Sequence, residues 1–349
     1  MEPAPRSQPD GTLTPATQPS AGEASDTGPM TSLWKDGRFH NRSGPAPHGL
    51  PAVLRWMCTR STGPWPAPMA AAPVAAPAHR PEDGAIHATL IGHATVLLQV
   101  AGLTILTDPV WSTRIGPTSW LGIKRVRPPA FALQDCPPID VILVSHNHYD
   151  HLDRPSLAFL AKRDAPLILT GLKGAHVIPA RDVVELDWWA SHRLPRGVSI
   201  TYVPAQHFSG RGLFDRNHSL WGGFVVETPA GTIYFAGDTG FGPHFAAIRR
   251  RFGPATLALL PIGAFAPRWF MARVHVDPQQ AVAASRILEA QVSLAIHYGT
   301  FPLADDGMDA PLQELATTLA TVPHGARGGD LRTPAWGESV TIRREVLPG

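Results

Sequence analysis

Four potential metal ligands lie close together in the middle of the chain. The segment 141–151 reads Val-Ile-Leu-Val-Ser-His-Asn-His-Tyr-Asp-His, so an apolar run leads into His146, His148, Asp150 and His151. Imidazole nitrogens and carboxylate oxygens are the ligands of zinc and its neighbours, and neutral imidazole is available near pH 7. On an extended backbone, positions 146 and 148 point the same way, and Asp150 and His151 reach a second position. The segment therefore predicts a metal site.

Three more apolar runs end in a potential ligand. Residues 200–203 precede His207, residues 232–235 precede Asp238, and residues 294–296 precede His297. Active-site groups of α/β proteins collect at such strand ends. A single histidine after a strand is usually an ordinary polar residue, but four such loops in one chain indicate one shared site.

The elements that must position these residues alternate between strands and helices. Helices are expected at 50–59, 155–163, 243–252, 279–290 and 310–320, and Asp277 and Pro278 supply an N-cap and a first-turn proline for the fourth. Strands are expected where short β-branched apolar runs lie between turn residues, at 86–91, 95–100, 103–107, 139–145, 167–170, 198–203, 223–227, 231–236, 256–261 and 292–296. This alternation predicts a layered α/β domain.

Composition divides the chain into three parts. Of the 37 prolines, 15 lie within residues 1–81. Residues 1–33 are predicted to be a disordered tail, because they lack enough apolar surface to offset the entropy of ordering. Residues 34–84 carry several tryptophans and other apolar side chains, and we expect an arm that packs on the core. Residues 85–345 form the predicted main domain.

The overall composition excludes several classes of protein. Two cysteines exclude a disulfide framework, and a net charge of +2 is too mild to indicate a nucleic-acid partner. The sequence shows neither a secretory signal nor an apolar run long enough to span a membrane. We therefore expect a cytoplasmic protein, with peripheral association at a membrane left open.

The motifs resemble the metallo-β-lactamase superfamily and, within it, the N-acylphosphatidylethanolamine-hydrolysing phospholipases D. The resemblance covers residues 34–322 and is most specific at Pro267–Met271 and His275–Pro278. It is carried by Ile91-Gly92-His93-Ala94-Thr95-Val96, Leu106-Thr107-Asp108-Pro109-Val110, Ser145-His146-Asn147-His148-Tyr149-Asp150-His151-Leu152-Asp153, Pro204-Ala205-Gln206-His207, Ala236-Gly237-Asp238-Thr239-Gly240, Pro261-Ile262-Gly263-Ala264, Pro267-Arg268-Trp269-Phe270-Met271, His275-Val276-Asp277-Pro278 and Ile296-His297-Tyr298-Gly299-Thr300-Phe301.

The resemblance implies an αββα sandwich, in which two mixed sheets face each other between helices and the metal site lies at one edge. It also implies two divalent ions, with Asp238 bridging them. The first ion takes His146, His148 and His207, and the second takes Asp150, His151 and His297. A ligand set without cysteine favours zinc and leaves iron or manganese open.

Further roles follow from the same resemblance. Asp108 is expected to accept the second ring N–H of a ligand histidine. His275 is expected to contact substrate or protonate the leaving group, alongside the catalytic Asp150 and Asp238. Substrate contacts are expected from Trp269, Phe270 and Met271, with Trp188 and Trp189 as further candidates for an apolar groove.

The implied reaction is hydrolysis of a phospholipid phosphodiester by a metal-bridging hydroxide, which frees an N-acylethanolamine and leaves phosphatidic acid. The alternative is another hydrolase of the same fold that acts on an ester, lactone, amide or soluble phosphodiester. A non-catalytic metal- or lipid-binding protein is disfavoured because all seven ligands are present. The expected partners are the phospholipid substrate, a membrane surface contacted peripherally, and a second copy in a homodimer.

Overall fold

The structure is a computed structural model that describes residues 31–345 apart from 73, 78–83, 119, 213 and 324. Of the predicted disordered tail, residues 1–30 lie outside the described residues, and the first strand begins at Leu33. The predicted boundaries between tail, arm and main domain stay predictions.

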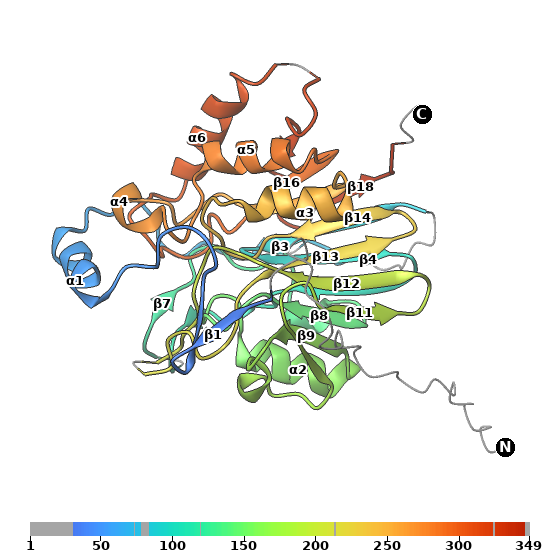
Figure 1. Cartoon of the computed structure of the whole chain (residues 1–349), viewed down its shortest axis with the longest axis horizontal. Helices are drawn as coiled ribbons and strands as arrows, with labels where there is room; N and C mark the ends of the chain where they lie inside the picture. The colour runs from blue at the N-terminus through green and yellow to red at the C-terminus, as the bar shows by residue number, and fades with distance from the viewer. Residues whose placement is uncertain are drawn as a thin grey trace.

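Two sheets of seven strands each form the centre of the molecule (Figure 1). The first sheet has the order β10 (Val183–Leu186), β9 (Leu167–Gly171), β8 (Val141–Val144), β5 (Leu103–Thr107), β4 (Thr95–Val100), β3 (Ile86–Gly92) and β18 (Ser339–Ile342). The second has the order β11 (Ser191–Leu194), β12 (Val198–Val203), β13 (Gly223–Thr228), β14 (Gly231–Phe235), β15 (Leu257–Pro261), β16 (Val292–Ile296) and β17 (Leu331–Arg332). Two small hairpins lie outside these sheets, β1 (Leu33–Lys35) with β2 (Arg38–His40) and β6 (Arg114–Ile115) with β7 (Ile123–Lys124).

Six helices accompany the sheets in the part of the chain that the structure describes. They are α1 (Leu50–Thr59), α2 (Arg154–Asp164), α3 (His244–Phe252), α4 (Arg268–Met271), α5 (Pro278–Ile287) and α6 (Ala310–Leu319), with short 3-10 turns at Leu133–Asp135 and Ala175–Val177. Leu157 and Leu160 of α2 pack with Ile142 and Ile168 of the first sheet. The core that includes the second sheet takes in apolar residues of α3 and α5. The predicted αββα sandwich of two mixed sheets flanked by helices is therefore confirmed.

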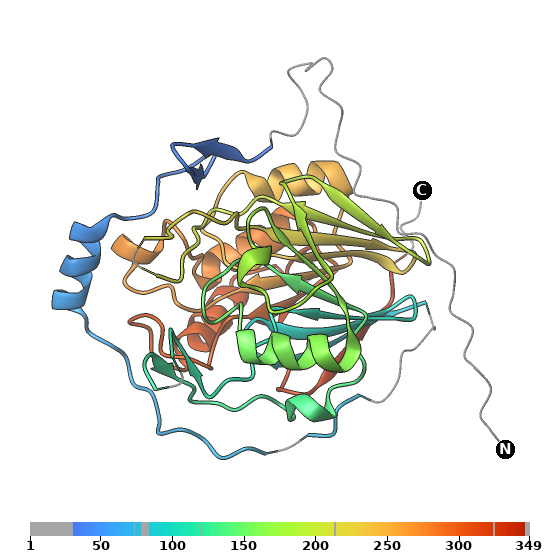
Figure 2. The same ribbon diagram turned by 90° about the horizontal axis from the view of Figure 1, so that it is seen from below.

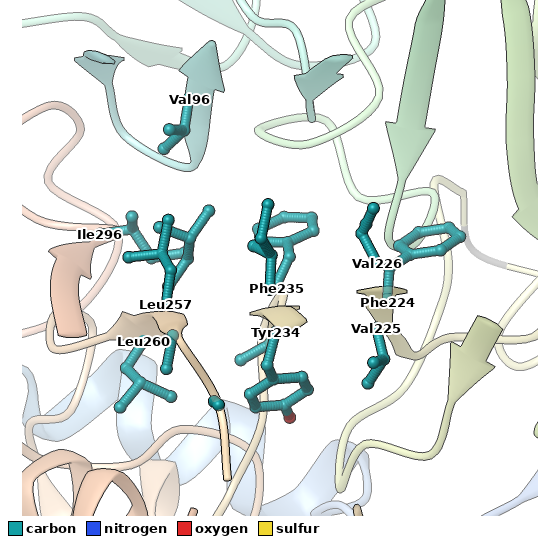
Figure 3. Packing of buried hydrophobic residues seen from close by; sticks show 14 of the residues in the cluster. Val96, Phe224, Val225, Val226, Tyr234, Phe235, Leu257, Leu260 and Ile296 are labelled. Carbon is teal, nitrogen blue, oxygen red and sulfur yellow. The ribbon is translucent and has the colours of Figure 1, made fainter. Parts of the chain in front are cut away.

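The main core lies between the two sheets. Successive side chains along a buried strand point to opposite faces, so every second residue points into this core. Figure 3 shows Val226, Phe235 and Leu257 of the second sheet pointing toward Val96 of the first. Their neighbours Val225 and Tyr234 point the other way. Both faces of the second sheet are thus apolar, as expected for a sheet covered on both sides.

Strand direction brings the predicted ligands to one edge. In the first sheet β4 is antiparallel to both β3 and β5, and β5 is parallel to β8, so β3, β5 and β8 run the same way. In the second sheet β12, β14 and β16 share one direction by the same reasoning. The loops that follow these six strands therefore lie at one edge of the sandwich, with three loops from each sheet.

The N-terminal arm runs around the outside of the two sheets (Figure 2). Phe39 is buried, and its N–H donates to the carbonyl of Asn217. Further along, the N–H of Gly63 donates to the carbonyl of Asp305, and Met69 donates in the same way to Val126. Backbone hydrogen bonds at several points between residues 38 and 69 thus hold the arm to the main domain.

The predicted elements agree with the structure to within a few residues, including α1 in the arm. The expectation missed β10, β11, β17 and β18, which lie at sheet edges and have exposed or half-buried positions. It also missed α4 and the two small hairpins. Among the described residues no helix is long and apolar enough to cross a membrane.

Candidate metal centre

All seven predicted ligands converge where the two sheets present their strand ends. His146, His148, Asp150 and His151 follow β8, so they come from the first sheet. The remaining three come from the second sheet, where His207 follows β12, Asp238 follows β14 and His297 follows β16. Six of the seven residues are buried and His148 is half-buried.

Asp238 lies at the centre of this cluster. Its Oδ2 is 3.1 Å from His151 Nε2 and 3.2 Å from His297 Nε2. The same oxygen is 3.8 Å from His207 Nε2 and 4.0 Å from His146 Nε2. One carboxylate oxygen thus faces both predicted halves of the site, which is the position that a bridging ligand requires.

Each half is a compact group of donor atoms. In the first, His148 Nδ1 lies 2.8 Å from His146 Nε2 and 3.3 Å from His207 Nε2. In the second, Asp150 Oδ2 lies 3.4 Å from His151 Nε2 and 3.3 Å from His297 Nε2. Both groups are close enough for their members to share an ion.

In three of the histidines the Nδ1 atom points away from the centre of the cluster, and its contacts show whether the site fits a metal. The Nδ1 atom of His151 lies 2.6 Å from Asp108 Oδ2, and that of His207 lies 2.9 Å from the carbonyl of Val274. His146 Nδ1 lies 2.9 Å from Ser145 Oγ. These contacts leave the three Nε2 atoms facing the centre, and His151 Nε2 and Asp238 Oδ1 are buried without a hydrogen-bond partner. The donor set fits divalent metal ions.

The two halves of the site differ in protonation, because the carboxylates raise the pKa of His151 well above its ordinary value against the effect of burial. Burial lowers the pKa of His146 and His207 well below the ordinary value and that of His148 to about 4, so these rings are neutral near pH 7. Burial also acts on His297, but Asp238 and Asp150 outweigh it and raise its pKa to about 9. Metal binding at such a site displaces protons, because a ligand imidazole must be neutral.

Asp108 contacts one of the predicted ligands directly. It follows β5, is fully buried and is 2.6 Å from His151 Nδ1. Ser145 donates to it twice, from its backbone N–H at 2.7 Å and from its hydroxyl at 2.6 Å. The carboxylate is thereby fixed and in turn holds the ring of His151.

His275 also points into the site. Its Nδ1 lies 3.9 Å from Asp238 Oδ2 and is buried without a hydrogen-bond partner. Burial lowers the pKa of His275 to about 4, so the ring is neutral. An unpaired nitrogen beside the Asp238 carboxylate is free to contact a bound molecule.

The predicted apolar substrate contacts do not form one surface. Trp269 is 42% exposed, whereas Met271 is buried beside Ala264 and Ala304. Trp188 is buried in the main core, and Trp189 stacks on Phe252 at the end of α3. Met271, Trp188 and Trp189 therefore belong to packing, and they do not line an exposed groove.

Sequence reasoning assigned no role at this edge to two contributors. One is His93, which follows β3 as the predicted ligands follow their strands, and that placement was the available signal. The other is the arm, whose Asn41 donates from Nδ2 to the carbonyl of His207 at 2.8 Å. Trp56 of α1 stacks on Phe270 with ring centroids 4.9 Å apart. No local pattern in residues 34–60 points to these distant partners.

Comparison with known families places the chain. A family model described as the beta-lactamase superfamily domain matches residues 104–298, which is more than half of the chain. The chain belongs to the metallo-β-lactamase superfamily. This membership and the His/Asp cluster support a metal-dependent hydrolase of the family.

Named relatives are similar over most of the domain. The chain is 40% identical over 234 residues to an N-acyl-phosphatidylethanolamine-hydrolyzing phospholipase D 1 of Caenorhabditis elegans, which covers 63% of this chain and 66% of that protein. It is 37% identical over 239 residues to the mitochondrial N-acyl-phosphatidylethanolamine-hydrolyzing phospholipase D of Saccharomyces cerevisiae, covering 66% of this chain and 51% of that protein. The chain thus spans just under two thirds of one relative's length and about half of the other's.

A solved structure of a metallo hydrolase from Ignicoccus hospitalis, Igni18, shares the fold. Its TM-score is 0.54 at 22% identity, and the match covers 75% of this chain and all of that one. This agreement confirms the architecture of the metallo-β-lactamase superfamily.

Proposed function

We propose that this protein is a phosphodiesterase of phospholipase D type that hydrolyses N-acylphosphatidylethanolamine-like lipids to N-acylethanolamine and phosphatidic acid. The observation that carries the proposal is the position of Asp238 Oδ2 between two ligand groups, with the unpaired Nδ1 of His275 beside it. The printed activity of the nematode and yeast relatives supports the substrate class.

In this proposal the residues hold two divalent ions. His146, His148 and His207 hold one, the group of Asp150, His151 and His297 holds the other, and Asp238 is shared. Two such ions supply positive charge to phosphate oxygens and lower the pKa of water. The buried rings exclude bulk water, which strengthens every charge interaction within the site.

His275 is proposed to contact the leaving group. Its ring is held through the backbone, since its N–H donates to the carbonyl of Met271 and its own carbonyl accepts from Arg268 Nη1 at 3.0 Å. A neutral imidazole carries one N–H. When Nδ1 carries this hydrogen, His275 can donate it to the oxygen on which charge develops as the phosphodiester bond breaks.

Helix α1 is proposed to meet the lipid surface. Its residues Leu50, Leu54 and Met57 are exposed, and it carries Arg55 but no acidic side chain. It lies beside α4, which leads into the loop of His275 (Figures 1 and 2). Apolar residues beside a basic one suit the boundary of an anionic bilayer, where each Lys or Arg contributes about 1 kcal/mol.

Vesicle binding tests this contact. Sedimentation with vesicles that contain phosphatidylglycerol should recover less of a Leu54→Ser, Met57→Ser double variant than of the wild type. Phe159→Ser on α2 is the control, because Phe159 is also exposed. Equal recovery of the double variant and the wild type would count against a lipid contact at α1.

The reaction itself is tested with purified, metal-loaded protein and a substrate panel. The panel contains N-acylphosphatidylethanolamine, a soluble phosphodiester, a lactone and an amide. We expect N-acylethanolamine and phosphatidic acid from the lipid, with loss of both products in Asp238→Asn. Turnover of another class without any N-acylethanolamine would establish the alternative hydrolase instead.

We propose zinc as the bound ion and a homodimer as the assembly. An all-N/O ligand set accepts zinc, iron and manganese, so elemental analysis of protein purified without added metal decides the ion. Light scattering coupled to size exclusion gives the mass of the assembly, and a monomer mass of 37.5 kDa would refute the dimer.

A further inference from the structure

His93 occupies an unusual position at the metal centre. It lies in the turn between β3 and β4, its side chain is buried, and its ring centroid is 4.1 Å from that of His297. The ring of Phe301 packs edge-on against it, with centroids 5.2 Å apart. The imidazole is therefore fixed from two sides and directed at the half of the site that contains Asp150.

The side chain and the backbone of His93 each contact a different predicted ligand. Its Nε2 lies 3.1 Å from Asp150 Oδ2. Its carbonyl accepts from the backbone N–H of His297 at 2.8 Å. Since a carboxylate can only accept, Nε2 carries the hydrogen. One residue thus restrains two of the three ligands proposed for the second ion.

The backbone conformation shows that this contact comes at a cost. His93 has φ of +56°, in the left-handed region that is strained for a residue other than glycine. A glycine would make the turn and the hydrogen bond to His297 without that strain. What only the histidine supplies is the imidazole beside Asp150.

By distance His93 could itself be a ligand, because its ring nitrogen lies within 4.8 Å of donor atoms of Asp150, His151 and His297. Asp238 Oδ2 already lies 3.1 and 3.2 Å from the Nε2 atoms of His151 and His297, so it completes that half of the site. The Nε2 of His93 is instead engaged by Asp150 Oδ2.

We propose that His93 is a positioning residue, whose Nε2–H orients the Asp150 carboxylate and whose carbonyl fixes His297 for the second ion. The proposal rests on the two-ion site described above. Groups that orient metal ligands typically change metal affinity 10- to 100-fold when removed.

The test measures metal affinity, so it does not depend on any substrate. Competition with a chromophoric chelator yields the two zinc dissociation constants of the full chain. For His93→Phe we expect one of the two zinc sites to lose about 10- to 100-fold in affinity while the other keeps its affinity. His93→Gln can place an N–H near the former Nε2, and it should stay within a few-fold of the wild type.

Controls separate positioning from ligation and from simple damage. His244→Gln alters another buried histidine, which contacts Thr239 Oγ1 at 3.1 Å, and it should leave both constants unchanged. In an Asp150→Ala background, His93→Phe should cause little further loss, because its effect passes through that carboxylate.

Three results would overturn the proposal. They are unchanged zinc affinities in His93→Phe, an equal loss in His93→Gln and His93→Phe, or fully additive losses in the double variant. Equal losses with an altered visible spectrum of the cobalt form would instead make His93 a ligand. Normal binding of two ions without lipid hydrolysis would refute the proposed substrate and leave the assignment of His93 intact.

Discussion

Asp238 lies between the two groups of candidate metal ligands, and a single oxygen of its carboxylate faces both. Five histidine nitrogens lie within 4.0 Å of its Oδ2, and its Oδ1 has no hydrogen-bond partner. Its charge therefore acts on more of the buried imidazoles than a contact with a single histidine would allow.

Replacing that charge should therefore empty at least one half of the site. We expect Asp238→Asn to bind less than two equivalents of zinc and to lose about 100-fold or more in turnover, since a neutral amide cannot serve as a bridging anion. Elemental analysis and initial rates check this result. Asp330→Asn, which changes an exposed aspartate, is the control. Full zinc content in Asp238→Asn would contradict the bridging assignment.

His244 gives a pH dependence with a definite sign. Burial lowers its pKa to about 3, from an ordinary value of 6.5. Between these values the unfolded chain binds a proton that the folded chain does not, so acidification favours unfolding. The free energy of unfolding should fall by about 1.4 kcal/mol per pH unit for this group below pH 6.5.

His244→Gln should remove that share of the acid sensitivity. Urea unfolding of metal-free protein at pH 7.5 and 5.0 measures how far the free energy of unfolding falls in the wild type and in the variant. We expect the fall to be about 2 kcal/mol smaller in the variant. Equal falls would show that His244 is protonated as easily in the folded state as in the unfolded one.

At the scale of elements, α5 holds the segment that follows His275. Asp277 Oδ1 accepts from the N–H of Gln280 at 2.7 Å, and the side-chain oxygen of Gln280 accepts in turn from the N–H of Asp277. Arg268 also lies 3.1 Å from Asp277 Oδ2, which ties α4 to the start of α5. This capping box fixes the direction in which the chain leaves the site.

Loss of the cap should destabilise the protein. Asp277→Ala is expected to lower the free energy of unfolding by about 1 kcal/mol, because an N-cap side chain typically contributes 0.5–2 kcal/mol. Asp309→Ala is a matched control, since Asp309 is the N-cap residue of α6 and makes no capping hydrogen bond. Chemical denaturation compares the two. Equal losses would mean that the cap of α5 contributes nothing.

At the scale of the whole molecule, the site draws its ligands from both sheets. An ion bound there links loops of the two sheets and stabilises only the folded state. Binding at 1,000 times the dissociation constant stabilises the fold by about 4 kcal/mol. We therefore expect removal of metal by chelation to lower Tm by several degrees, with a smaller shift in Asp238→Asn. Scanning calorimetry measures both, and an unchanged Tm in the wild type would contradict metal binding to the folded state.

The sequence predicted most of this arrangement because the relevant signals are local. An apolar run followed by His or Asp predicts both a strand and a candidate ligand, as at His207 and Asp238. The role of His93 was not visible, since a single histidine after a glycine has no periodic pattern. The stacking of Trp56 on Phe270 joins residues more than 200 positions apart. Such contacts arise from the fold as a whole, and no local window contains them.

The path of the arm has a consequence for the order of events during synthesis. Asn41 leaves the ribosome early, yet its partners His207 and Trp221 are made much later. The arm must therefore wait while most of the two sheets are completed, and only then can it close over the loop of His207. Since domains fold as their chain emerges, closure of the arm is a late step in the maturation of the site.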